Sequence, residues 1–431
     1  MVTGSPEHAV TQARCGATAG RSLRARGQAL ACRSRFPPYP PPPMHPSHIR
    51  SQAAFLEVVK RSSDADELCL DCEFQGEGRY YPNLCLVQLG FGAERVAIDP
   101  QQVNLGLLAT VLESEGIRKV LHDGRQDLPL LARAVGTTSF RSVFDTQVAA
   151  AFAGYGGSIG YGALVSDLCG VELDKSLQVS DWTRELSDEQ IEYALDDVRY
   201  LAEVSSKLRT KLAASGRMPW VLDACLDTVR RALTKPDPEK LYRRLGSLSR
   251  LNGEQLGILR EIAKWRERVA EAINKPIATV ASDLALKSLA LQPPKDRRSL
   301  EGVRGLGAGR SQPWARELFE ALALGAANPE PAQSIQRDRE VLIEGLTSVL
   351  GLARRFVAIR EGIAGELLGT QAELRALAEW QLDGRPGKSS VGVLEGWRRP
   401  VIGELLLEVL SGEVAFRIDP AAPGGTDVVR R

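Results

Sequence analysis

The sequence predicts an α/β domain followed by helical domains, and three observations support this prediction. Between residues 51 and 157, short apolar runs typical of strands are interleaved with helical segments. After residue 157 the apolar residues recur about every 3.6 positions almost throughout, as they do in helices. Two breaks, "TKPDPEK" at 234–240 and "GAANPEP" at 325–331, divide the helical part. Strands first and helices second are typical of an α/β or α+β catalytic domain.

The expected elements of the α/β part follow one another closely. We expect strands over 67–74, 83–90, 95–100 and 118–122, and helices over 51–62, 107–116 and 126–136. Gly136 closes the last of these helices. Ser187 and Gln190 form a capping box, which predicts the start of one helix over 188–208.

The breaks predict the domain boundaries. We expect a tail over 1–46, the α/β domain over 47–233, a linker over 234–246, a helical domain over 247–327, a second helical domain over 328–420 and a tail over 421–431. The first helical domain has more Lys and Arg than Asp and Glu, so it is mildly basic. The second is a candidate for a degenerate repeat of the first.

The composition excludes several classes of protein. A chain of 431 residues is long enough for two or three domains. Its 43% hydrophobic and 25% charged residues exclude a disordered or fibrous chain, and no apolar run approaches the roughly 18–20 residues that span a bilayer. The net charge of +1 indicates no class of partner. Cys69 and Cys72 form C-x-x-C inside an apolar strand without a second pair, so we expect reduced core thiols in a cytosolic protein.

The first 46 residues differ from the rest. They are rich in Arg, contain a single acid, Glu7, and end near the polyproline run "FPPYPPPPMHP". We expect a disordered basic tail, or a start codon placed upstream of a true start at Met44, in preference to an organelle-targeting segment.

Two carboxylates on one strand are the first sign of chemistry. In "ELCLDCEF", Asp71 and Glu73 are two residues apart and therefore share one face of the strand. Side by side, they repel each other and resist desolvation, and a divalent cation is the usual compensation. Taken alone, such a pair is more often a solvated outer face.

Further acids follow at two separate places. Asp127 lies at a strand-to-helix junction, where a carboxylate also serves as a helix cap. Tyr193 and Asp197 are four residues apart and share a helix face, with Asp196 as a competitor for the same role. Four carboxylates from separate elements suit a pair of Mg²⁺ ions about 3.5–4 Å apart. Tyr193 is a poor base at neutral pH, so we expect it to orient the water.

Five stretches carry a resemblance to a known family: "LCLDCEF...RYYPNLCLVQLG", "KVLHDGRQDLPLL", "FDTQVAAAF", "LDKSLQVSDWTRELSDEQIEYALDDVRYL" and "GRMPWVLDAC". They resemble the ribonuclease D family of DEDD-type 3′–5′ exonucleases, in the subgroup with a catalytic tyrosine. The resemblance implies a ribonuclease H-like domain with a mixed sheet. It also implies metal-binding acids at Asp71, Glu73, Asp127 and Asp197, rather than Asp196, with a catalytic tyrosine at Tyr193.

The helical domains also carry a resemblance. "LREIAKWRERVAEAINKPIATVASDLALKSLA" and "SLEGVRGLG" resemble an HRDC domain, and "GWRRPVIGELLLEVLSG" resembles a second, divergent one. The family likeness implies two all-α HRDC-type domains and two divalent ions, Mg²⁺ or Mn²⁺. It further implies a cytoplasmic exoribonuclease that trims RNA 3′ ends, particularly of tRNA precursors, and releases 5′-mononucleotides.

Other polar residues have weaker signals. The candidate RNA contacts are Lys175, Trp182, Arg184, Arg297, Arg298 and Arg304, and a wider basic patch would add Lys264, Arg266, Arg268 and Arg310. Alternatively, Trp182 packs in the core, and the Lys and Arg side chains lie on the solvated surface without contacting RNA. We expect His122 to be structural and Asp145 to start a helix.

Two rival functions stay open at this point. A DNA 3′–5′ exonuclease would use the same acids, because two-metal chemistry does not require a 2′-hydroxyl. A non-catalytic RNA-binding protein would keep the fold without the chemistry.

Overall fold

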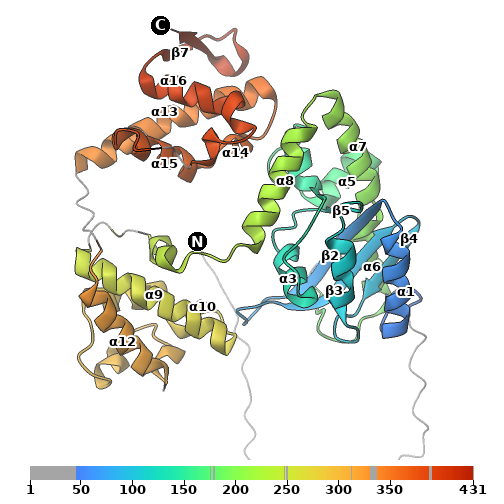
Figure 1. Cartoon of the computed structure of the whole chain (residues 1–431), viewed down its shortest axis with the longest axis horizontal. Coiled ribbons are helices and arrows are strands. Elements are labelled where there is room, and N and C mark those ends of the chain that lie inside the picture. Colours follow the sequence, from blue (N-terminus) through green and yellow to red (C-terminus); the bar gives the residue numbers. More distant parts are fainter. Residues whose placement is uncertain are drawn as a thin grey trace, which may run out of the picture. The chain divides into compact units, whose positions relative to one another are not determined.

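The computed structural model describes residues 45–174, 176–177, 180–246, 248, 251–311, 313–330, 337–387 and 391–430 (Figure 1). Nearly all of the predicted basic tail over 1–46 lies outside these residues, as does Lys175. Within the described part, no helix combines the length and the apolar character that crossing a membrane requires.

A six-stranded mixed sheet forms the α/β part. The strands are β1 (His48–Ile49), β2 (Glu67–Gln75), β3 (Asn83–Phe91), β4 (Glu94–Ile98), β5 (Arg118–Leu121) and β6 (Val143–Asp145). Their order in the sheet is β1-β4-β3-β2-β5-β6. β2, β3 and β4 form the antiparallel meander, whereas β1, β5 and β6 pair in parallel with their neighbours. The expected mixed sheet is therefore confirmed.

Helices cover both faces of the sheet (Figure 1). They are α1 (Gln52–Ser63), α2 (Ala109–Leu112), α3 (Asp127–Val135), α4 (Thr146–Phe152), α5 (Tyr161–Cys169), α6 (Asp188–Arg199), α7 (Leu201–Ala214) and α8 (Met218–Leu233). Leu68 and Leu70 of β2 pack in one cluster with Phe55 of α1 and Leu128 of α3. Cys69 points to the other face, in a cluster with residues of α5 and α7. This alternation leaves Asp71 and Glu73 on the face of α6, because residues two apart share a face.

The prediction of a single helix over 188–208 is wrong, because the segment divides at Tyr200 into α6 and α7. The hydroxyl of Tyr161 donates to the carbonyl of Asp196 and accepts the backbone N–H of Tyr200, both at 3.2 Å. A side chain inserted into the i→i−4 ladder breaks a helix. Tyr161 is distant in sequence, so the local periodicity did not show this break.

The middle part is all-helical and has its own core. Its helices are α9 (Gly253–Ile273), α10 (Ile277–Val280), α11 (Asp283–Leu291) and α12 (Trp314–Ala327), preceded by the 3₁₀ helix η2 (Pro238–Leu245). Trp265 of α9 is fully buried in this core. α9 and α12 meet at two glycines: a Cβ on Gly257 would lie 2.5 Å from the carbonyl oxygen of Gly325, so both positions require the absence of a side chain.

The C-terminal part is mostly helical but not all-α as expected. Its elements are α13 (Arg337–Glu361), α14 (Gly365–Leu368), α15 (Gln371–Leu382), α16 (Glu404–Ser411), β7 (Val414–Ile418) and β8 (Thr426–Arg430). β7 and β8 form an antiparallel hairpin, so the expected tail over 421–431 contains a strand. Short runs such as "VAFRI" and "TDVVR" form strands only when they can pair with each other. The spacing of residues within each run does not show whether they pair.

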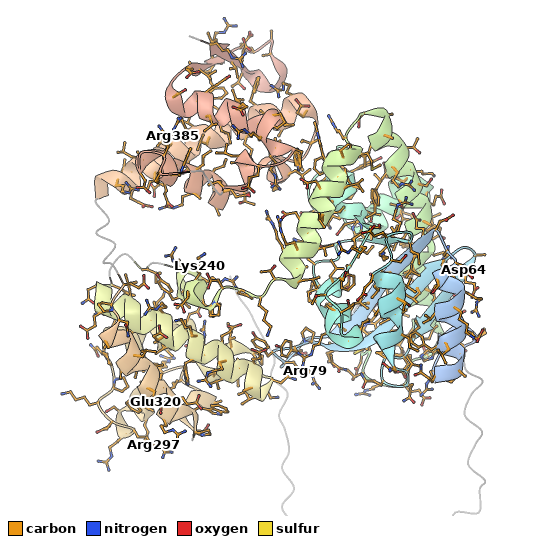
Figure 2. All side chains as sticks on the ribbon, in the orientation of Figure 1. Asp64, Arg79, Lys240, Arg297, Glu320 and Arg385 are labelled. Atoms are coloured by element: carbon orange, nitrogen blue, oxygen red, sulfur yellow. The ribbon has the colours of Figure 1, made fainter. Side chains whose placement is uncertain are left out.

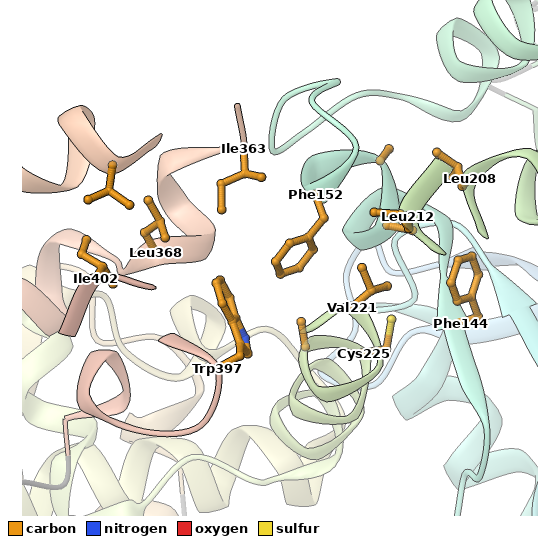
Figure 3. Close-up of a cluster of buried hydrophobic side chains, with 14 of the residues drawn as sticks. Phe144, Phe152, Leu208, Leu212, Val221, Cys225, Ile363, Leu368, Trp397 and Ile402 are labelled. Carbon is orange, nitrogen blue, oxygen red and sulfur yellow. The ribbon is translucent and has the colours of Figure 1, made fainter. Parts of the chain in front are cut away.

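One buried cluster contains residues of both the α/β part and the C-terminal helices (Figure 3). The ring of Trp397 lies 4.9 Å from that of Phe152 in α4, and it stacks at 5.4 Å on that of Trp220 in α8. Ile363 and Leu368 belong to the same cluster. The aromatic contacts tie the C-terminal helices to α4 and α8.

Candidate active site

Three carboxylates from two separate elements meet on the sheet. Asp71 and Glu73 of β2 and Asp197 of α6 each offer an oxygen, and these oxygens all lie within 4.8 Å of one another. α6 begins at the capping box of Ser187 and Gln190, which the sequence predicted. β2 and α6 therefore bring Asp71, Glu73 and Asp197 into one acidic cluster, as expected for a cation site.

The fourth expected acid lies next to this cluster. Asp127 is the first residue of α3 and only 8% exposed. It does not belong to the group within 4.8 Å, yet its charge contributes to the raised pKa of Asp71. The structure thus brings three of the predicted acids together and places the fourth within electrostatic reach.

Asp145 holds the turn that leads to Asp127. Its carboxylate accepts the backbone N–H groups of Asp123 at 3.1 Å and Gly124 at 3.0 Å. It also caps α4 by accepting the N–H of Gln147 at 2.9 Å, so the expected helix start is confirmed. Asp123 adopts a positive φ of 58°, a conformation that few residues other than glycine accept without support. The sequence indicated the cap but not the bonds to the turn.

Burial raises the pKa values of the acidic cluster and of Asp127, and so disfavours their ionised forms. Burial, and then repulsion from Asp127, Asp197 and Glu73, raises the pKa of Asp71 well above its ordinary value. The same causes raise the pKa of Glu73 to about 8, and burial first of all raises the pKa values of Asp127 and Asp197 to about 7. A bound cation would reverse this effect, since opposite charge favours the ionised form. The oxygen donors fit hard divalent cations such as Mg²⁺ and Mn²⁺.

Tyr193 lies one helical turn before Asp197 on α6 and is partly exposed. Burial and the neighbouring carboxylates, Asp197 first, raise its pKa to about 12. Its hydroxyl is therefore protonated at neutral pH and acts as a hydrogen-bond donor or acceptor rather than as a base.

The predicted RNA contacts near the acids have different surroundings. Trp182 is 7% exposed, its ring centre lies 6.3 Å from that of Tyr193, and it packs with Leu86 and Ile191, which favours core packing over base stacking. Arg184 is largely exposed and forms an ion pair with Asp181.

Five of the candidate basic residues of the middle helical part have two kinds of surroundings. Arg297, Arg298 and Arg304 are exposed, and none of them has an ion-pair partner among the described residues. Arg297 lies at the outer edge of this part in Figure 2. By contrast, Arg266 is buried and bonds Asp283, and Arg268 pairs with Glu317. Arg297, Arg298 and Arg304 are therefore available to a ligand.

His122 is structural, as its position in the sequence indicated. Its Nδ1 lies 2.9 Å from the hydroxyl oxygen of Thr146, and its Nε2 lies 3.0 Å from the carbonyl oxygen of Ile159. Burial lowers its pKa, so the ring is neutral near pH 7. Both ring nitrogens are engaged, and neither is free for catalysis.

Comparisons with known proteins agree with this arrangement. A 3′–5′ exonuclease family model matches residues 46–213, and an HRDC domain model matches residues 255–322. The chain is 33% identical over 389 residues to ribonuclease D of Granulibacter bethesdensis, covering 86% of this chain and 96% of that protein. It is 32% identical over 368 residues to ribonuclease D of Pseudomonas paraeruginosa, covering 84% and 96%.

A solved structure supports the same assignment. The Escherichia coli RNase D structure, described as that of an exoribonuclease involved in structured RNA processing, aligns with a TM-score of 0.72 and 28% identity. The alignment covers 86% of this chain and 99% of that chain. With relatives above 30% identity over most of its length, this chain belongs to the ribonuclease D family, and it is a 3′–5′ exoribonuclease.

Proposed function

We propose that this enzyme hydrolyses RNA from the 3′ end by two-metal-ion catalysis, with Asp71, Glu73, Asp127 and Asp197 as the metal ligands. The observation that supports this most directly is the convergence of carboxylate oxygens of Asp71, Glu73 and Asp197 within 4.8 Å. When bound, a pair of Mg²⁺ or Mn²⁺ ions activates water and stabilises the departing oxyanion. Asp127 joins the ligand set from the start of α3, where the helix N-terminus offsets part of the burial that raises its pKa.

Tyr193 orients the attacking water in this proposal. Its hydroxyl is on the same helix face as Asp197, and its raised pKa keeps the proton on the oxygen. A neutral hydroxyl donates or accepts one hydrogen bond, which would hold the water in position.

The substrates that we propose are RNAs with 3′ extensions, in particular tRNA precursors, and the products are 5′-mononucleotides. The relative from Escherichia coli is described as acting in structured RNA processing, which supports this class of substrate. We assign RNA contacts to Arg297, Arg298 and Arg304, because these cations are exposed and unpaired within the described part of the chain. Residues 328–420 are proposed as a second, divergent HRDC-like domain, and the cytoplasm as the location.

The test is digestion of a 3′-extended tRNA precursor with Mg²⁺, with analysis of products by mass. We expect 5′-mononucleotides, and a loss of at least about a hundredfold in rate for Asp71→Asn and Asp197→Asn, because even the loss of a ligand's supporting partner costs about ten- to a hundredfold. A matched DNA strand measures the preference for RNA. Trimming at the wild-type rate by either variant would contradict the assignment of the metal ligands. Equal rates on matched DNA and RNA strands would contradict the proposal that RNA is the substrate.

A further inference from the structure

Gln88 lies in the middle of the sheet, and its buried amide has no hydrogen-bond partner among the residues that the structure describes. Its side chain has an exposed fraction of 0%. Neither Nε2 nor Oε1 has a hydrogen-bond partner in the described part of the chain. Buried amides are nearly always hydrogen-bonded, because an unsatisfied donor or acceptor costs free energy. A native residue that bears this cost calls for an explanation.

The position of Gln88 in the sheet points to the acidic cluster. Gln88 of β3 is directly opposite Asp71 of β2 in the antiparallel pair. Side chains opposite each other in such a pair lie on the same face with their Cβ atoms about 4.5–5.5 Å apart. On its other side, Gln88 is opposite Ala97 of β4, which offers no polar side-chain group. Asp71 is therefore its polar neighbour across the sheet.

Asp71 lacks what Gln88 can supply. The hydrogen bond that lowers the pKa of Asp71 comes from the backbone of Cys72, and among the described residues no side chain donates to its carboxylate. A carboxylate that ligates a metal usually accepts a hydrogen bond from a neighbouring group, which orients it. The unused donor of Gln88 and the missing donor at Asp71 are complementary.

We infer that Gln88 is a positioning residue: with metal bound, its Nε2 donates to the carboxylate of Asp71 and holds that ligand in orientation. This inference rests on the proposed metal site. A small rotation of either side chain is sufficient, because the two residues are already cross-strand neighbours. The unpaired amide then destabilises the metal-free protein because it is placed to donate a hydrogen bond to Asp71 in the metal-bound protein.

The test compares Gln88→Met with Leu89→Met. Methionine resembles glutamine in length and shape but has no amide, and Leu89 is equally buried on the opposite face of the same strand. We measure Mn²⁺ binding to the full-length protein by electron paramagnetic resonance, and the melting temperature without metal. For Gln88→Met we expect Mn²⁺ affinity to fall by about ten- to a hundredfold while the metal-free melting temperature stays equal or rises. For Leu89→Met we expect wild-type Mn²⁺ affinity.

Two outcomes would overturn the inference. Wild-type Mn²⁺ affinity in Gln88→Met would show that the amide does not support the site. A lower metal-free melting temperature in Gln88→Met than in Leu89→Met would show that the amide serves the fold. Gln88→Leu replaces Gln88→Met if the latter fails to fold. Asp71→Asn separates this inference from the proposed function: if the wild type and Asp71→Asn bind Mn²⁺ equally, the metal site itself is wrong.

Discussion

The hydroxyl of Tyr161 accepts a hydrogen bond from the backbone N–H of Tyr200 at 3.2 Å. In a continuous helix, that N–H would bond the carbonyl of Asp196, which instead accepts the Tyr161 hydroxyl. The inserted oxygen separates α6 from α7 three residues after Asp197. A side chain from α5 therefore sets where the helix that carries Tyr193 and Asp197 ends.

Removing this hydroxyl is expected to loosen the acidic cluster. In Tyr161→Phe, the N–H of Tyr200 becomes free to bond the carbonyl of Asp196, which straightens the helix and moves Asp197. We expect a rate loss of about tenfold or more, a higher Mg²⁺ requirement and a modest loss of stability of about 1 kcal/mol. Tyr155→Phe is the matched control, since Tyr155 packs against the same buried cluster. Equal Mg²⁺ requirements in the two variants would contradict a role in site geometry.

Tyr193→Phe is expected to slow catalysis without weakening metal binding. The ring and its packing stay, and only the hydroxyl that orients water is lost. We expect a decrease of about a hundredfold or more in kcat, within the range for a positioned proton-bearing group, with Mn²⁺ affinity unchanged. Because the pKa of Tyr193 is raised to about 12, we expect no loss of wild-type rate between pH 7 and 10 from its ionisation. A parallel loss of Mn²⁺ affinity would show a ligand-supporting role instead.

The acidic cluster is expected to make the metal-free protein less stable as pH rises. The folded pKa values of Glu73, about 8, and of Asp127 and Asp197, about 7, lie above the ordinary values of the unfolded chain. The folded state therefore binds more protons than the unfolded state, and the favourable contribution, complete below about pH 4, is lost as pH rises through 7 and 8. Melting temperatures measured without metal from pH 5 to 8 check this sign.

The control for this pH effect is Asp127→Asn combined with Asp197→Asn. Replacing two of the four predicted metal-binding carboxylates should flatten the slope of melting temperature against pH. Mg²⁺ should raise the wild-type melting temperature more at pH 8 than at pH 5, because binding requires the ionised acids. A slope unchanged by the double substitution would assign the pH dependence to groups elsewhere.

Three exposed arginines of the middle helical part, which have no ion pair among the described residues, are expected to bind RNA phosphates. Replacing Arg297, Arg298 and Arg304 by Ala should weaken RNA binding, and the slope of log affinity against log salt should fall by about 2 if each contacts one phosphate of a single strand. Lys264→Ala with Arg268→Ala is the control, because both cations are held in ion pairs. An unchanged salt slope in the triple variant would exclude these arginines as RNA contacts.

Local patterns in the sequence predicted much of the fold and indicated the three acids that meet in the candidate site. The alternation in β2 placed Asp71 and Glu73 on one face, the capping box placed the start of α6, and the four-residue spacing placed Tyr193 and Asp197 together. These features depend on side chains that are neighbours in the chain, so strand and helix periods are sufficient to predict them.

Contacts between distant residues needed the tertiary structure. The break at Tyr200 depends on Tyr161, the turn before Asp127 depends on Asp145, and the surroundings of Gln88 depend on the register of β3 against β2. The β7–β8 hairpin likewise exists because two short runs meet. The sequence by itself determined which residues are acidic and which faces they share. Only packing decided which distant groups support them, because no short-range period encodes a partner tens of residues away.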